Sequence, residues 1–305
     1  MDLMIKYKNL GDRLVLGTAG LAGIWGPVDF KESVKVLHCA WDNGILYTDT
    51  APAYAEAESL VSKALKSWKG KLPVISTKVG KRKAEHPDAT LFDYSAAYIL
   101  QSVEESRRLF DRDQIDIVFL HDPGCMPVIE IRAAIDTLLE LQQKGIIRSL
   151  GIGGNYGQLF QPFAVSGVFD YFMGYNRYNL VTQVAAESEF PELKLAAVKI
   201  WQASPLYMGL LGRKYEDFQK ELPDWIAAKD LLTAKRFHEY CQEMQLSLTG
   251  LALNYIHESL KVDRMVLGAS TIKELEESLL WLGEGAERSV ALGLLKENNP
   301  IVGQP

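Results

Sequence analysis

The stretch IDIVFLHDPGCMPVIEIRAAIDTLLELQQKGIIRSLGIGG (115–154) contains a strand, a helix and a second strand in direct succession. IDIVFLH (115–121) and SLGIGG (149–154) are short, mainly apolar runs, whereas IRAAIDTLLELQQKG (131–145) has helical spacing. The helical segment closes with Lys-Gly (144–145), which is a helix C-terminal signal. Strands that are apolar on both faces and alternate with helices predict a parallel sheet.

The same alternation runs along the chain and predicts eight strands. Helical spacing is also found in 32–44 and 94–110, and two helical segments, 225–244 and 247–260, precede the last strand. The expected strands are RLVLGT (13–18), ILYTD (45–49), LPVISTK (72–78), IDIVFLH (115–121), SLGIGG (149–154), FDYFMGY (169–175), KIWQASP (199–205) and RMVLGAS (264–270).

Eight strand–helix units in about 250 residues or more are typical of a TIM (β/α)8 barrel. No linker or shift in composition divides the chain, so we expect one domain over 1–305. A doubly wound sheet is the alternative, but its GxGxxG turn after the first strand is missing.

Composition narrows the class of protein. The chain has 305 residues, a formal net charge of -6 and 48% hydrophobic residues, which is sufficient for a large core. A mildly acidic chain is not expected to bind nucleic acid or anionic lipid as its main partner. No secretory signal or membrane-spanning run is visible, and the three cysteines have no metal-binding spacing. We therefore expect a cytoplasmic protein that acts on a small molecule and binds no metal. Composition is compatible with a homo-oligomer.

Polar residues stand where three successive strands end. The second, third and fourth strands end in Asp49, Lys78 and His121, and Tyr54 follows in the loop after the second strand. The carboxyl ends of barrel strands meet at one mouth, where TIM barrels carry their chemistry. Helix capping for Asp49 and ordinary packing for Tyr54 are the alternatives. Buried charges at three adjacent strand ends nevertheless need partners, which this mouth supplies.

These four side chains suit proton transfer coupled to hydride transfer. A phenol has an ordinary pKa of about 10 and is a poor acid at neutral pH. A neighbouring ammonium lowers that pKa, and a carboxylate behind the ammonium keeps it charged and oriented. A histidine can orient the substrate oxygen. Such a group protonates a carbonyl as hydride arrives, or deprotonates an alcohol as hydride leaves.

DTAPAY (49–54) with Glu58 after it, then STK (76–78) and FLH (119–121), resemble the aldo-keto reductase family. The resemblance extends from GTAGL near the start to GAST near residue 270. The catalytic tetrad of the family falls on Asp49, Tyr54, Lys78 and His121. The resemblance also implies a (β/α)8 barrel and an oxidoreductase that uses NAD or NADP.

The resemblance also implies where the dinucleotide lies across the barrel mouth. QASPLYMGLLG (202–212) resembles the family's pyrophosphate loop, although SPL is also compatible with a plain turn. Loops after strand seven commonly bind phosphate in barrels, and GASTIKELEES (268–278) opens a helix whose N–H groups suit an anion. The cofactor-binding residues expected in this way are Gly17, Thr18, Ala19, Asp49, Gly154, Asn155, Ser204, Leu206, Gly209, Gly268, Ser270, Glu274 and Ser278.

The contacts expected around the nicotinamide depart from the family pattern. Ala203 replaces the usual stacking aromatic residue, and Gly154 or Asn155 stands where a Ser-Asn pair is usual. The glutamine that usually ends strand six is absent. Tyr178 is either a substitute stacking ring or part of the core.

These departures resemble one branch of the family, the aldose 1-dehydrogenases, which oxidise the anomeric hydroxyl of a sugar to a lactone. NRY (176–178) and ASPL (203–206) carry this resemblance. The expected substrate-binding residues are Tyr54, His121, Trp25 as a stacking wall, and Asp122 as an acceptor for a sugar hydroxyl. Packing for Trp25 and a turn cap for Asp122 are the alternatives.

Two positions after strand eight favour NAD over NADP. Gly268 and Glu274 stand where relatives that prefer NADP have cations for the adenosine 2′-phosphate. A carboxylate would repel that phosphate and could accept a hydrogen bond from a free ribose hydroxyl. Thr271 and Glu274 also form a capping box, and Lys273 is a neighbouring cation that could meet a phosphate.

Other functions are compatible with the same residues. A general NADPH-dependent aldehyde or ketone reductase would use the same tetrad. A non-catalytic cofactor-binding subunit is a second alternative, which the intact tetrad disfavours. A metal-dependent barrel hydrolase would use Asp49, His121 and Asp122, but the chain has no HxH motif and its five histidines are scattered.

Overall fold

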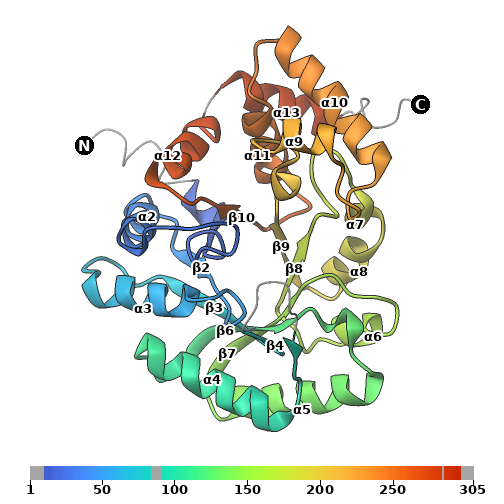
Figure 1. Cartoon of the computed structure of the whole chain (residues 1–305). Coiled ribbons are helices and arrows are strands. Elements are labelled where there is room, and N and C mark those ends of the chain that lie inside the picture. The colour runs from blue at the N-terminus through green and yellow to red at the C-terminus, as the bar shows by residue number, and fades with distance from the viewer. Residues whose placement is uncertain (1–9, 84–90, 284, 297–305) are drawn as a thin grey trace.

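The barrel predicted from the sequence is confirmed. The computed structural model describes residues 10–83, 91–283 and 285–296, and its eight parallel strands close in the order β1-β10-β9-β8-β7-β6-β3-β2 (Figure 1). The alternative of a doubly wound sheet is wrong, since β1 pairs with both β2 and β10. The barrel strands are β1 (Leu14–Gly17), β2 (Tyr47–Asp49), β3 (Val74–Val79), β6 (Ile115–His121), β7 (Ile147–Gly153), β8 (Tyr171–Tyr175), β9 (Lys199–Ala203) and β10 (Arg264–Gly268).

Helices surround the barrel (Figure 1). The helical segments expected from the sequence form α2, α4 and α5, and both α10 and α11 precede β10. Helix α5 ends at Gln143, and Gly145 has the left-handed φ of 71° that the Lys-Gly signal implies. The helices are α2 (Phe30–Asp42), α3 (Ala57–Ser67), α4 (Ala96–Phe110), α5 (Val128–Gln143), α6 (Gln161–Ala164), α7 (Val184–Glu187), α8 (Glu189–Leu195), α9 (Tyr215–Lys220), α10 (Ala228–Glu243), α11 (Leu248–Glu258), α12 (Ile272–Trp281) and α13 (Ala286–Lys296), with 3-10 turns η1 (Gly11–Arg13), η2 (Pro123–Cys125) and η3 (Tyr207–Gly209).

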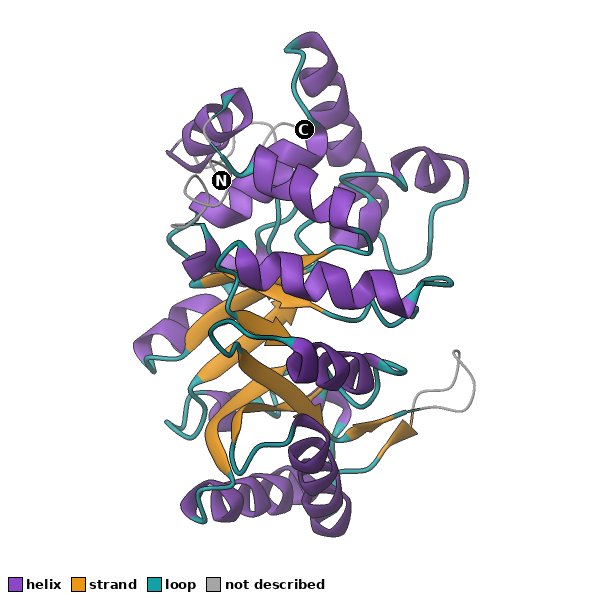
Figure 2. Ribbon diagram, turned by 90° about the vertical axis from the view of Figure 1, so that its left-hand side faces the viewer, coloured by secondary structure: helices purple, strands orange, loops and turns teal. Residues whose placement is uncertain are grey.

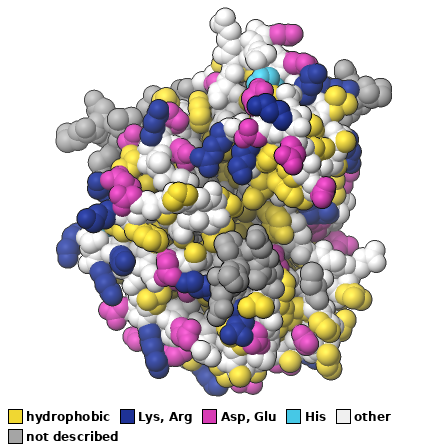
Figure 3. Space-filling model, viewed as in Figure 1, with side chains coloured by type: hydrophobic (Ala, Val, Ile, Leu, Met, Phe, Trp, Pro, Cys, Tyr) yellow, Lys and Arg dark blue, Asp and Glu magenta, His cyan; other side chains and the backbone are white. Residues whose placement is uncertain are grey.

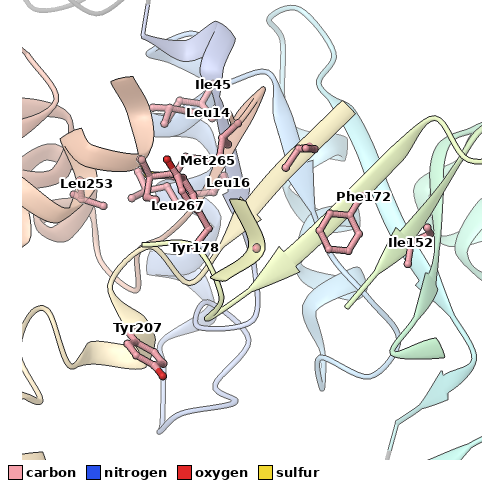
Figure 4. Packing of buried hydrophobic residues seen from close by; sticks show 14 of the residues in the cluster. Leu14, Leu16, Ile45, Ile152, Phe172, Tyr178, Tyr207, Leu253, Met265 and Leu267 are labelled. Atoms are coloured by element: carbon pink, nitrogen blue, oxygen red, sulfur yellow. The ribbon is translucent and has the colours of Figure 1, made fainter. Parts of the chain in front are cut away.

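Two apolar layers follow from the alternation of side chains along each strand. On β1, Leu14 and Leu16 belong to the large cluster between the strands and the helices, part of which Figure 4 shows. Val15 lies between them in sequence but belongs to a second cluster with Phe119 and Trp201. Successive strand residues point to opposite faces, so this second cluster fills the barrel interior.

A short hairpin was not expected from the sequence. Strands β4 (Lys81–Arg82) and β5 (Leu91–Phe92) pair antiparallel and project from one end of the barrel (Figure 2). Two-residue strands have no recognisable periodicity, which explains the omission. Because β4 follows the carboxyl end of β3 almost directly, the hairpin brings Lys81 to the barrel mouth.

The face of the molecule seen in Figure 3 is hollowed near its middle. Hydrophobic side chains gather around this hollow, and Lys and Arg side chains lie above it in that view. Among the described residues, no helix combines the length and the apolar composition that crossing a membrane would require.

Candidate active site

A buried ion pair joins the ends of β2 and β3. The Lys78 ammonium lies 2.5 Å from one oxygen of Asp49, and both side chains are almost fully buried. The other oxygen of Asp49 accepts a hydrogen bond of 2.7 Å from the Ser76 hydroxyl. Lys78 also donates to the Thr50 carbonyl at 3.0 Å. A buried charge pair is tolerated only when its remaining hydrogen-bonding capacity is satisfied, and these contacts supply that.

Tyr54 and His121 lie on the mouth side of this pair. The Lys78 nitrogen is 4.6 Å from the centroid of the Tyr54 ring. The Tyr54 and His121 rings meet edge to face, with centroids 5.8 Å apart. Tyr54 is half-buried, whereas His121 ends β6 and is almost fully buried. The four residues singled out in the sequence therefore come together in space.

The electrostatics of this cluster are dominated by burial. Burial raises the pKa of Tyr54 above its ordinary value of 10, and the Lys78 ammonium opposes this effect without overcoming it. Burial alone would lower the pKa of Lys78, but Asp49 and Tyr54 together outweigh this effect, and the pKa of Lys78 is raised. Burial, assisted by Lys78 and Lys81, lowers the pKa of His121 well below 6.5. The ammonium is therefore charged and the imidazole neutral at neutral pH. The lowering of the Tyr54 pKa by Lys78 that was expected from the sequence is present, but burial outweighs it and the net shift is upward.

Asp122 follows His121 and has a left-handed backbone, with φ 48° and ψ 52°. Its carboxylate lies 3.0 Å from the Lys81 ammonium and 3.8 Å from Nε2 of His121. The Tyr94 hydroxyl hydrogen-bonds to the carbonyls of both His121 and Asp122. Asp122 is the N-cap residue of η2, but its side chain makes no capping hydrogen bond, so the simple turn-cap interpretation fails. Sequence reasoning missed Lys81 and Tyr94: the basic run KRK (81–83) just after β3 was a signal for Lys81, and no local pattern marked Tyr94.

The loop after β9 is strongly bent where the sequence predicted pyrophosphate binding. Ser204, Tyr207 and Met208 all have positive φ, which is uncommon for residues other than glycine. The Ser204 hydroxyl contacts the Met208 sulfur at 3.4 Å. Gly209 has a φ of 104°, and a side chain there would crowd Lys214. Backbone strain of this kind accumulates at binding sites.

Glu274 connects this loop to the start of α12. One oxygen of its carboxylate accepts a hydrogen bond of 2.7 Å from the Ser270 backbone N–H, and the other lies 2.9 Å from Arg213. The Thr271 hydroxyl in turn caps the Glu274 N–H. The capping role that the sequence suggested for Glu274 therefore has direct structural support, and Arg213 is a partner that was not foreseen.

The remaining expected cofactor residues lie around the same mouth. Thr18 binds the Asp49 carbonyl through its N–H and its hydroxyl. Gly17, paired with Gly268 on β10, and Ala19 are half-buried, and Gly268 is exposed with open space beside its Cα. Ser278 is buried and donates to the Glu274 carbonyl, which is a bond within α12.

The residues considered for the nicotinamide have differing surroundings. Asn155 donates to the Tyr175 carbonyl at 3.0 Å and accepts from its N–H at 3.3 Å, which leaves one donor and one lone pair of the amide available. Gly154 lies directly against Asp122. Tyr178 is buried with Leu253 and Leu267 in the outer cluster (Figure 4), and its hydroxyl pairs with Ser259. Tyr178 is therefore a core residue and not a stacking ring.

Trp25, the expected sugar-stacking residue, lies in the loop after β1 with its ring against Gly20. It is 54% exposed. A Cβ on Gly20 would lie 3.1 Å from the Trp25 ring and 3.1 Å from the Ser270 hydroxyl, so Gly20 is enclosed between them. Trp25 therefore lies near Ser270, which follows β10.

A cavity of about 610 Å³ opens beside the loop after β9. Asn155, Tyr175 and Met208 are among its lining residues, whereas none of Asp49, Tyr54, Lys78 and His121 lines it. This cavity therefore does not enclose the tetrad. No group of three or more His, Cys, Asp or Glu in the described parts of the chain is arranged to hold a metal ion.

The protein is a (β/α)8 barrel whose mouth carries Asp49, Tyr54, Lys78 and His121. The Aldo/keto reductase family model matches residues 13–282, and the chain belongs to that family. It is therefore an oxidoreductase acting on CH–OH groups.

Named relatives are similar over most of their length. The chain is 30% identical to D-arabinose 1-dehydrogenase of Saccharomyces cerevisiae, over 87% of this chain and 81% of that protein. It is 25% identical to pyridoxal 4-dehydrogenase of Microbacterium luteolum, over 88% of each. An aldo-keto reductase from Bacillus halodurans, solved in its holo form, has a TM-score of 0.74 at 25% identity and covers 93% of this chain and 91% of its own.

Aldo-keto reductases bind a nicotinamide cofactor, and the residues around this mouth fit one. The first-turn N–H groups of α12, at Ile272 and Lys273, have no acceptor within the helix. Arg213 and its neighbour Lys214 add two cations, Arg213 in contact with Glu274 of α12, and nothing lies within 4 Å of a Cβ placed on Gly268. These donors suit the anionic pyrophosphate of a dinucleotide.

Proposed function

We propose that this enzyme oxidises an aldose at C1 to its lactone and transfers the hydride to a nicotinamide cofactor. Tyr54, Lys78, Asp49 and His121 are the proposed catalytic residues. The observation that carries the proposal is the buried Lys78–Asp49 pair, whose Lys78 nitrogen lies 4.6 Å from the centroid of the Tyr54 ring. The similarity of the chain to a D-arabinose 1-dehydrogenase supports an aldose as the substrate.

Each side chain has a distinct role in this reaction. Tyr54 accepts the proton of the anomeric hydroxyl as the hydride leaves C1. Lys78 stabilises the phenolate that must form first, and Asp49 keeps the ammonium charged and oriented. His121 is neutral and can therefore hydrogen-bond the reacting oxygen without adding a competing positive charge.

The proposed cofactor is NAD in preference to NADP. Gly268 offers no cation to an adenosine 2′-phosphate. The Glu274 carboxylate lies at the start of α12, where it neutralises Arg213. Lys273 is paired only weakly with Glu277, at 3.8 Å, and is the cation that could oppose this preference. The expected contacts from Gly17, Thr18, Ala19, Gly154, Asn155, Ser204, Leu206, Gly209, Ser270 and Ser278 belong to the same proposal.

A spectrophotometric screen tests the proposed function. Aldoses, simple alcohols and aldehydes are offered with NAD and with NADP, and the product of any aldose oxidation is identified as lactone or otherwise. The proposal predicts lactone formation from at least one aldose. Efficient reduction of simple aldehydes without any aldose oxidation would contradict it.

That contradicting outcome would favour a second candidate, a general aldehyde or ketone reductase. The 25% identical pyridoxal 4-dehydrogenase is named for a substrate that is not an aldose, which favours a substrate range wider than aldoses. The cytoplasmic location and the option of a homo-oligomer stay predictions from the sequence.

A further inference from the structure

Asp122 has an unusually constrained position beside the reaction centre. Its backbone N–H donates to the Gly153 carbonyl at 2.7 Å, and its carbonyl accepts from Tyr94 at 2.9 Å. Its left-handed φ of 48° is uncommon among residues other than glycine, and Asp and Asn are the side chains that adopt it most readily. The two backbone hydrogen bonds hold this conformation in place, and residues held in this way cluster at active sites.

Two glycines permit this arrangement. A Cβ on Gly154 would lie 2.3 Å from the Asp122 carboxylate, and one on Gly80 would lie 2.2 Å from the Tyr94 ring. Both glycines have positive φ, at 133° and 102°. Any other residue at these positions would displace Asp122 or the tyrosine that holds its backbone.

The Asp122 carboxylate is paired with Lys81 from the hairpin at the barrel mouth. Their charged atoms are 3.0 Å apart, and the two side chains remain 21% and 29% exposed. The Lys81 nitrogen lies 5.8 Å from the centroid of Phe92, whose ring stacks on Tyr94. A partly exposed ion pair contributes little to stability. A contribution to stability therefore does not explain why Asp122 and Lys81 are held together at the barrel mouth.

The pair lies within reach of the substrate. The Asp122 carboxylate is 3.8 Å from Nε2 of His121, the residue proposed to bind the reacting oxygen. That oxygen would lie about 3 Å from the histidine nitrogen. A hydroxyl on the neighbouring carbon is then the substrate group best placed to donate a hydrogen bond to Asp122.

We propose that Asp122 and Lys81 recognise the hydroxyl on the carbon next to the reacting carbon. The enzyme is then selective for 2-hydroxy sugars and 2-hydroxy aldehydes over their 2-deoxy analogues. Asp122 accepts the hydroxyl hydrogen, and Lys81 is a positioning residue that orients the carboxylate. The inference rests on the proposed function because it takes His121 as the residue at the reacting oxygen.

The test compares pairs of substrates that differ only in this hydroxyl. In oxidation, each aldose is compared with its 2-deoxy analogue; in reduction, lactaldehyde is compared with propanal. The kcat/KM ratio of each pair is measured for wild type, Asp122→Asn, Lys81→Met, Lys81→Arg and Lys83→Met. Asparagine tolerates the left-handed backbone, so the first variant is expected to fold. Lys83 has its own exposed ion pair with Glu56 on the same segment and serves as the matched control.

The wild type should prefer the 2-hydroxy substrate by about 10- to 100-fold, the range expected for a hydrogen bond to a charged group. Asp122→Asn should reduce that preference to within about twofold, Lys81→Met should reduce it partly, and Lys81→Arg should restore it. Lys83→Met should leave it unchanged. Lys81→Met should act mainly through KM of the 2-hydroxy substrate.

A preference that is absent in the wild type, or unchanged in both Asp122→Asn and Lys81→Met, would overturn the inference. Oxidation of aldoses with such an unchanged ratio would leave the proposed function standing. If the enzyme oxidises no aldose but prefers lactaldehyde, and Asp122→Asn abolishes that preference, the inference stands and the proposed function is contradicted. Turnover of none of these substrates would overturn both.

Discussion

At the scale of single residues, the account depends on where protons and charges lie at the barrel mouth. Asp49, Lys78 and His121 could be singled out from the sequence because polar residues rarely end apolar strands. Their partners Ser76 and Tyr94 could not be identified from the sequence, because these pairings depend on tertiary contacts. The net direction of the Tyr54 pKa shift depends on burial, which no local pattern reveals.

Tyr54→Phe should lower kcat by about 10²- to 10⁴-fold, the usual contribution of a general acid–base group, and leave cofactor affinity nearly unchanged. Steady-state kinetics at saturating substrate and a cofactor titration by fluorescence measure the two effects. Tyr156→Phe is the matched control, because the Tyr156 hydroxyl is buried without a partner among the described residues. A Tyr54→Phe enzyme with half the wild-type kcat would remove Tyr54 from the proposed role.

The pH dependence of oxidation follows from the same pKa values. Oxidation needs the Tyr54 phenolate, and the pKa of this phenol is raised above 10, so kcat/KM should climb with pH beyond neutrality and not level off below pH 10. The pKa of His121 is well below 6.5, so no histidine-linked change is expected above that pH. Lys78→Met removes the charge that favours phenolate and should move the profile to still higher pH or abolish activity. An unmoved profile, with chemistry shown to limit the rate, would exclude Lys78 from the mechanism.

At the scale of secondary-structure elements, the start of α12 and the loop after β9 decide cofactor choice. The sequence predicted the capping contact of Glu274, because the TIKE pattern is local. The contact of Glu274 with Arg213 joins residues 61 positions apart, so a local sequence pattern could not predict it.

Glu274→Arg should shift the ratio of kcat/KM for NADP over NAD upward by about 10-fold or more. The substitution removes a carboxylate, frees Arg213 and adds a second cation, and hydrogen bonds to charged groups are worth about 1.5–3 kcal/mol. Both cofactors are assayed with one substrate, and Glu276→Arg, an exposed change of equal charge on the same helix, is the control. An unmoved ratio would show that Glu274 only caps α12, and a wild-type preference for NADP would contradict the proposed use of NAD.

At the scale of the whole molecule, the closed barrel was predictable because buried parallel strands have a strong apolar pattern. The hairpin of β4 and β5 was not predictable, since each of its strands has only two residues. The position of Lys81 at the barrel mouth depends on this hairpin and was therefore not predictable either. That residues 1–305 form one domain stays a prediction, which the pairing of β1 with β10 favours for the part described.

Barrel-interior packing leads to a prediction on stability. A Cβ on Gly151 of β7 would lie 2.4 Å from the Phe119 ring in the barrel interior. Gly151→Ala should therefore lower the free energy of unfolding by about 1–3 kcal/mol, the usual cost of overpacking a core. Gly157→Ala is the control, because nothing lies within 4 Å of the added carbon. Denaturant titrations measure the unfolding of both variants. Equal unfolding midpoints for Gly151→Ala and Gly157→Ala would show that the barrel interior accommodates the added carbon without cost.

The central claim is that hydride leaves C1 of an aldose while Tyr54 takes the hydroxyl proton. The most direct test offers the enzyme an aldose deuterated at C1 and follows the label by mass spectrometry and NMR of the recovered cofactor. The account predicts that the deuterium appears on the nicotinamide ring in proportion to the lactone formed, and that Tyr54→Phe slows this transfer by about 10²-fold or more. Lactone without labelled cofactor, or label transfer at the wild-type rate in Tyr54→Phe, would contradict it.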